Sequence, residues 1–150
     1  MTRKLTLALL SGAALVAGAC GNADTVAEAP AATVDASAVE AGRAKAVLVY
    51  ADWCGSCKAL EPNVEAARSA GDLPVEFVTL DYTDKDADAF FSQADAAGVG
   101  QAVRAKMGDS IKTGQLLLVD LDDQEVRDVV TKSDTPVMIR TKIVEAAAAS

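Results

Sequence analysis

Two cysteines, Cys54 and Cys57, lie three residues apart at a predicted junction between a strand and a helix. Residues 46–51 before the pair are apolar and β-branched, as in a buried central strand. Residues 57–70 repeat apolar side chains at helical spacing, and Gly71 closes this pattern. A thiol at a helix N-terminus meets unpaired backbone N–H groups and the positive end of the helix dipole, and both favour thiolate. We therefore expect Cys54 to be the exposed attacking thiol and Cys57 the more buried resolving thiol.

A stapling disulfide and half of a zinc site are the other interpretations of this pair. A loop as short as Cys-x-x-Cys gains little chain-entropy stabilisation from a crosslink. A structural zinc would need two more soft ligands, whereas the chain has no histidine and its third cysteine, Cys20, lies near the N-terminus. The sequence therefore favours redox chemistry and predicts no metal site, with stapling and metal binding left as alternatives.

The composition narrows the chemistry further. Without histidine the chain cannot use an imidazole as a general base or a metal ligand. Lys and Arg total 14 against 22 Asp and Glu, a formal net charge of −8, which argues against a nucleic-acid partner. We predict no cofactor.

The N-terminus is typical of an export signal over residues 1–19. Arg3 and Lys4 precede an apolar run at residues 5–16, which is shorter than the about 20 residues of a transmembrane helix. Cys20 follows small residues directly, as in the lipobox of bacterial lipoproteins, where the cysteine becomes the lipid-carrying first residue. The alternative is ordinary signal cleavage before an unmodified cysteine.

Residues 20–37 are predicted to be the lipid-attachment site and a flexible tether, because the stretch after Cys20 has no apolar periodicity. Residues 38–150 are then one domain. We expect a periplasmic location with a membrane anchor at Cys20, and the inner leaflet of the outer membrane is favoured because Gly21 follows the cysteine. A solubilising leader without an anchoring role is the alternative.

The elements are expected in the order β-α-β-α-β-β-α, an α/β fold with a mixed four- to five-stranded sheet and helices on both faces. The second helix has an uncertain continuation through Met107, because Gly98 and Gly100 interrupt its pattern. Strands are expected at 46–51, 75–81, 115–121 and 125–131, and helices at 57–70, 86–97 and 136–144, the last capped by Thr135.

The residues around the pair resemble the thioredoxin-like family. The segment Trp53-Cys54-Gly55-Ser56-Cys57-Lys58 matches the family signature W-C-G-P-C-K except at Ser56, and Pro62 matches the proline that kinks the family's active-site helix. Residues 50–54 and 80–84 are most similar to the periplasmic C-terminal domain of the membrane reductant conductor DsbD. The resemblance extends over about residues 45–145 and implies a thioredoxin-like fold and disulfide exchange.

Supporting roles are expected for the neighbours of the cysteines. Gly55 would allow a tight turn, Ser56 completes the spacer, and Lys58 adds positive charge near the thiols. Trp53 is either a substrate contact or a packing residue. The acidic cluster that follows is interpreted as a solvated loop and helix start rather than a calcium loop, because it lacks the glycine and terminal glutamate of that pattern. This cluster consists of Asp81, Asp84, Asp86 and Asp88.

Two departures from the family pattern affect the predicted mechanism. Leu48 stands where thioredoxins carry a buried aspartate that assists proton transfer to the resolving sulfur. Gly114 stands where the family has a cis-proline, so the resemblance places a substrate groove at Thr113 and Gly114. Because glycine has no ring to cover the sulfurs, we expect the face opposite Cys54 to be more open than in proline-bearing relatives.

The predicted function is a thiol–disulfide oxidoreductase of the bacterial cell envelope that acts through Cys54 and Cys57. Its partners would be client proteins with cysteines or disulfides and an upstream membrane or periplasmic electron donor. A reductant or isomerase is favoured over an oxidant on the resemblance alone. The alternative from another class is a non-catalytic module that holds a partner protein, or a soft metal such as Cu(I), at the cysteine pair.

Overall fold

The computed structural model describes residues 43–150, so the expected signal at 1–19, Cys20, the tether and the first residues of the 38–150 domain lie outside it. The expected element order is confirmed, with one additional short helix. The elements are β1 (Ala44–Tyr50), α1 (Gly55–Ser69), β2 (Glu76–Asp81), α2 (Ala87–Ala96), α3 (Gly100–Met107), β3 (Gln115–Asp120), β4 (Glu125–Thr131) and α4 (Pro136–Ala148).

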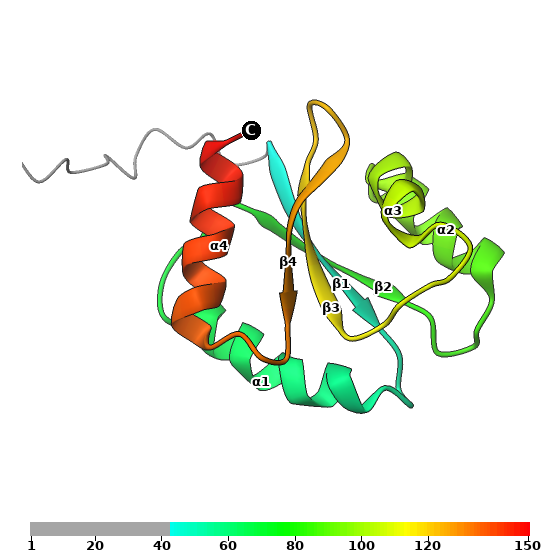
Figure 1. The fold of residues 1–150 in the computed structure, drawn as a ribbon, viewed down its shortest axis with the longest axis horizontal. Coiled ribbons are helices and arrows are strands. Elements are labelled where there is room, and N and C mark those ends of the chain that lie inside the picture. Colours follow the sequence, from blue (N-terminus) through cyan, green and yellow to red (C-terminus); the bar gives the residue numbers. More distant parts are fainter. Residues whose placement is uncertain (1–42) are drawn as a thin grey trace, which may run out of the picture. The chain divides into compact units, whose positions relative to one another are not determined.

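The four strands form one mixed sheet in the order β2-β1-β3-β4 (Figure 1). β1 pairs with β2 in parallel and with β3 antiparallel. β4 pairs with β3 as an antiparallel hairpin. The sheet therefore has the mixed character expected, and β1 lies at its centre.

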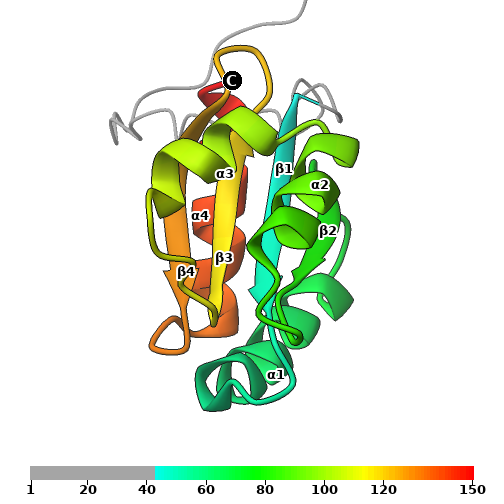
Figure 2. The same ribbon diagram turned by 90° about the vertical axis from the view of Figure 1, so that its right-hand side faces the viewer.

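Helices cover both faces of the sheet, as expected (Figures 1 and 2). α1 and α4 pack together on one face, and α2 and α3 on the other. Along β1, Val47 and Val49 join the apolar cluster under α2 and α3, which contains Phe90. Ala46, which precedes Val47 and points to the opposite face, joins the cluster under α1 and α4, which contains Leu60. A strand buried on both faces needs apolar side chains on both, which explains the continuous apolar run.

The helix boundaries follow local chemistry. Asp86 caps α2, because its Oδ1 accepts from the backbone N–H of Ala89 at 3.0 Å. Gly98 adopts a φ of +72° and separates α2 from α3. The segment through Met107 is therefore a separate helix, α3, and not a continuation of α2. α4 begins at Pro136 as expected but continues past Val144 to Ala148, because its last turn still has buried alanines. Within residues 43–150, no helix has both the length and the apolar character that crossing a bilayer requires.

Candidate redox site

The cysteine pair lies where β1 leads into α1. A turn over residues 51–54 is closed by the backbone N–H of Cys54, which donates to the Ala51 carbonyl at 3.0 Å. α1 starts at Gly55, two residues earlier than expected, because Cys54 itself is the N-cap. The Cys54 sulfur accepts from the backbone N–H of Cys57 at 3.1 Å. The sulfur thus lies at the helix N-terminus, where backbone donors stabilise a thiolate.

Cys54 and Cys57 are joined by a disulfide, with their Cα atoms 5.3 Å apart. Cys54 is 6% exposed and Cys57 is fully buried. Cys57 is therefore more buried than Cys54, as expected, but the expectation that Cys54 is exposed is wrong. Only a small part of its surface reaches solvent, because neighbouring backbone covers the pair.

That cover is provided by Gly114, in the loop before β3. Its backbone N–H donates to the Val49 carbonyl at 2.8 Å, and its φ is +81°. A Cβ on this residue would lie 2.5 Å from the Ser56 Cβ and 3.2 Å from the Cys54 sulfur. The expected register, with Gly114 facing the cysteines, is thus confirmed. Whether this face is more open than in proline-bearing relatives stays a prediction, although the bare backbone of Gly114 approaches the pair closely.

Proline cannot replace Gly114 in this conformation. The pyrrolidine ring fixes φ near −65° and removes the N–H that bonds to Val49. Residues 43–150 contain no cis peptide bond. Thr113 precedes Gly114 and is half-buried, so the backbone predicted to form the substrate groove lies beside the pair.

Position 48 supplies no carboxylate to the site. Leu48 is half-buried and packs against the apolar cluster under α1 and α4. The polar atom next to the Cys57 sulfur is the Val49 carbonyl oxygen, at 3.7 Å. A carbonyl accepts a hydrogen bond from a thiol but cannot take up its proton.

The other predicted support residues surround the pair. Trp53 is 51% exposed and lies edge-on to Tyr82, with ring centroids 6.4 Å apart. Lys58 is exposed in the first turn of α1. A Cβ added to Gly55 would meet no atom within 4 Å, and its φ is not positive, so this position does not require a glycine. The tight turn expected at Gly55 is therefore absent, because α1 already begins there.

A loop after β2 contributes contacts that the sequence did not single out as part of the site. The Trp53 indole N–H donates to the Thr83 carbonyl at 2.9 Å, and the Asp52 backbone N–H donates to Thr83 Oγ1 at 3.1 Å. Lys85 places its ammonium 5.0 Å from the centre of the Trp53 ring. The signal was present in the topology, because the carboxyl ends of parallel strands meet at one edge of a sheet.

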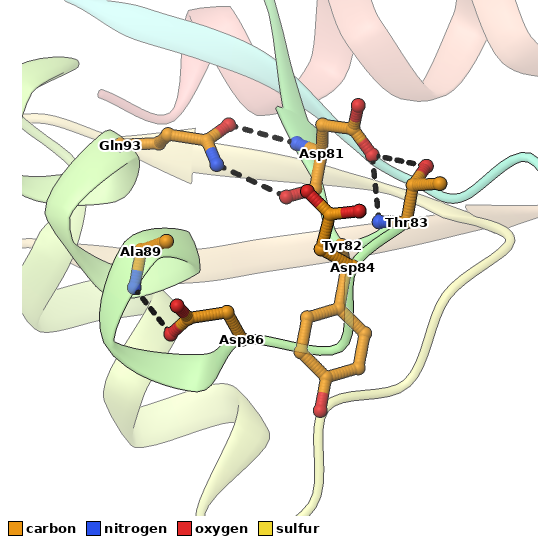
Figure 3. Close-up of a pocket in the computed structure, with 7 residues that line it drawn as sticks. All are labelled: Asp81, Tyr82, Thr83, Asp84, Asp86, Ala89 and Gln93. Carbon is orange, nitrogen blue, oxygen red and sulfur yellow. Dashed lines mark hydrogen bonds between the residues drawn. The ribbon is translucent and has the colours of Figure 1, made fainter.

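The acidic cluster beside this loop has structural roles. Asp86 caps α2, as expected of a helix start, and Asp81 holds Thr83 (Figure 3). In the part of the chain that the structure describes, no three Cys, Asp or Glu side chains gather in a way that could hold a metal ion.

Tyr50, at the end of β1, donates a hydrogen bond from its hydroxyl to Asp52 Oδ1 at 2.9 Å. This bond, followed by partial burial and the carboxylates of Asp52, Glu61 and Asp81, raises the pKa of Tyr50 above its ordinary value. The phenol therefore stays a neutral donor beside the cysteine loop and does not act as a base at neutral pH.

Comparison with known proteins agrees with this geometry. Residues 35–95 match the family model described as thioredoxin. The matched part includes β1, α1, β2 and all but the last residue of α2. No match is found among curated proteins.

The fold and the site together define a class of protein. The mixed sheet with helices on both faces is a thioredoxin-like α/β fold, and the matched residues contain the cysteine pair at disulfide distance. These features indicate a thiol–disulfide oxidoreductase in general.

Proposed function

We propose that this protein exchanges disulfides with client proteins in the bacterial cell envelope, as a reductant or isomerase. The observation that carries the proposal is the position of Cys54, whose sulfur caps α1 and accepts a backbone N–H while forming a disulfide with Cys57. Such a position favours the thiolate, which is the attacking species in disulfide exchange.

The exchange proceeds in two balanced steps. The Cys54 thiolate attacks one sulfur of a client disulfide, forms a mixed disulfide, and releases the other client sulfur as a thiolate. The Cys57 thiolate then attacks the Cys54 sulfur, which forms the Cys54–Cys57 disulfide and releases the second client sulfur as a thiolate. Two electrons pass from the pair to the client. Because the Val49 carbonyl cannot take the Cys57 proton, that proton goes to the released client thiolate or to water.

The envelope location rests on the sequence. The basic start, apolar run and Cys20 support export and lipid attachment, with the domain held near a membrane by the tether. An upstream electron donor in the membrane or periplasm would restore the dithiol after each turnover. The reducing direction is supported by the likeness of residues 50–54 and 80–84 to the C-terminal domain of DsbD.

Reduction of insulin in the presence of a chemical reductant tests this function. The wild-type chain is expected to accelerate insulin reduction, and Cys54→Ser to abolish the acceleration. Cys57→Ser is expected to accumulate mixed disulfides with clients, because the second attack is lost. If the wild-type chain binds clients or Cu(I) without accelerating reduction, the binding-module alternative is correct and the proposal is wrong.

A further inference from the structure

The loop between β2 and α2 lies directly beside the turn that carries Cys54. β1 and β2 are parallel, and the backbone N–H of Tyr82, just after β2, donates to the carbonyl of Tyr50, the last residue of β1, at 2.8 Å. The two chains therefore leave the sheet side by side. One continues into the Ala51–Cys54 turn, and the other into the loop that contains Thr83.

Thr83 contacts both central residues of that turn. Its hydroxyl oxygen accepts from the backbone N–H of Asp52 at 3.1 Å. Its carbonyl oxygen accepts from the indole N–H of Trp53 at 2.9 Å. Thr83, from a separate loop, thus fixes the backbone of Asp52 and the side chain of Trp53, the two residues before Cys54.

Thr83 is itself held in place by Asp81 (Figure 3). Its hydroxyl and its backbone N–H both donate to Asp81 Oδ1, at 2.5 and 2.8 Å. The Gln93 side chain from α2 makes two hydrogen bonds with the Asp81 backbone, accepting from its N–H at 2.9 Å and donating to its carbonyl at 3.0 Å. A continuous chain of hydrogen bonds therefore connects α2 to the turn before Cys54.

We propose that Thr83 is a positioning residue of the redox site, which holds the Cys54 turn in the orientation that stabilises the Cys54 thiolate. This inference rests on the proposed exchange reaction and assigns a residue to it outside the cysteine motif. The hydroxyl proton goes to Asp81, which leaves an oxygen lone pair to accept from Asp52. Valine has the same shape without the oxygen, whereas serine keeps it.

The chemical consequence follows from the N-cap geometry. The Cys54 sulfur accepts from the backbone N–H of Cys57 only while the turn directs it toward the first turn of α1. If Thr83 no longer anchors Asp52, the turn samples other orientations and the thiolate loses part of that interaction. The apparent pKa of Cys54 in the reduced protein then rises, and its reactivity at neutral pH falls.

The test measures the pH dependence of Cys54 alkylation in the reduced full-length chain by peptide-resolved mass spectrometry. Thr83→Val is expected to raise the apparent pKa of Cys54 and to slow its alkylation at neutral pH about fivefold, the factor that corresponds to one hydrogen bond of about 1 kcal/mol. The fluorescence emission of Trp53, the sole tryptophan, is expected to change in the same variant. Thr83→Ser is expected to restore both readouts.

Thr141→Val is the matched control, because its exposed hydroxyl bonds to the Val137 carbonyl within α4, away from the cysteine pair. It makes the same chemical change outside the site and is expected to leave the Cys54 profile unchanged. If Thr83→Val fails to fold, Gln93→Ala, which weakens the anchor of Asp81, decides the question. A raised Cys54 pKa in that variant supports the proposal, and an unchanged pKa overturns it.

A folded Thr83→Val chain with the wild-type Cys54 profile would overturn the proposal, as would failure of Thr83→Ser to restore it. Neither result depends on client turnover. A wild-type chain that does not reduce insulin would instead contradict the proposed function, and the alkylation comparison would still report whether Thr83 positions Cys54.

Discussion

At the scale of single residues, the site depends on how closely Gly114 approaches the disulfide. Its φ of +81° and the 2.5 Å separation between its added Cβ and that of Ser56 both exclude a side chain. Ser56 takes the place of the proline in the family signature, so this departure and the glycine at the family's cis-proline position lie next to each other.

Gly114→Ala is expected to destabilise the protein by about 2–4 kcal/mol, because left-handed strain adds to overpacking. Gly98→Ala is the matched control: its φ is +72°, but a Cβ there meets no atom within 4 Å. Gly98→Ala should lower the free energy of unfolding only by the cost of the left-handed backbone strain, about 1–2 kcal/mol. Chemical denaturation of the oxidised chains measures both.

The contribution of the contact itself can be isolated in a double variant. Ser56→Gly removes the Cβ that an alanine at position 114 would meet, so Gly114→Ala should cost less in that background. Equal costs for Gly114→Ala in both backgrounds, or equal costs for Gly98→Ala and Gly114→Ala, would contradict the packing described here.

At the scale of elements, the strands and helices could be predicted because their signals are local. The apolar run before Cys54 and the cap at Thr135 each identify an element from adjacent residues. The topology indicates that the Thr83 loop lies near the Cys54 turn, but the close approach of Gly114 and the individual contacts of Thr83 could not be predicted. Both depend on loops from different strands meeting at one sheet edge, at distances that only tertiary packing sets.

The loop between β4 and α4 is held by Asp134, which is 7% exposed. Burial alone would raise the pKa of this carboxyl, but the backbone N–H of Thr131 at 2.7 Å and the Lys142 ammonium at 3.2 Å outweigh it, so the pKa is lowered. A lowered folded-state pKa means that ionised Asp134 stabilises the fold above its unfolded pKa of about 4. This stability is lost as the pH falls through the folded-state pKa.

Asp134→Asn is therefore expected to destabilise the fold at pH 7 by about 1–3 kcal/mol. The deficit relative to wild type should shrink as the pH falls below about 4. Asp128→Asn is the control, because Asp128 also pairs with Lys142, at 3.6 Å, but is more exposed. It should cost less than about 1 kcal/mol. Denaturation midpoints across this pH range measure both, and a deficit for Asp134→Asn that is independent of pH would contradict the assignment.

At the scale of the whole molecule, the part of the chain with the thioredoxin-like fold follows an N-terminal segment whose sequence predicts a lipoprotein signal. We predict that Cys20 carries lipid and that the mature chain partitions to membranes. One acyl chain binds membranes only marginally, so stable anchoring requires the several chains of a bacterial lipoprotein. Intact mass spectrometry of membrane-extracted protein tests this, with Cys20→Ser as the control that should stay out of the membrane fraction. A mature chain that begins at an unmodified Cys20, or elsewhere, would contradict it.

The redox potential of the Cys54–Cys57 pair decides whether this protein is a reducing oxidoreductase, because it gives both the competence and the direction of exchange. Equilibration of the full-length chain with glutathione buffers of known ratio, followed by quantification of the dithiol, measures it. We predict reversible exchange with a potential of about −180 mV or more negative, in the range of disulfide isomerases and thioredoxins. A potential near about −120 mV, that of a dedicated oxidant, would contradict the reducing direction. A disulfide that does not exchange at any glutathione ratio would contradict the assignment to an oxidoreductase.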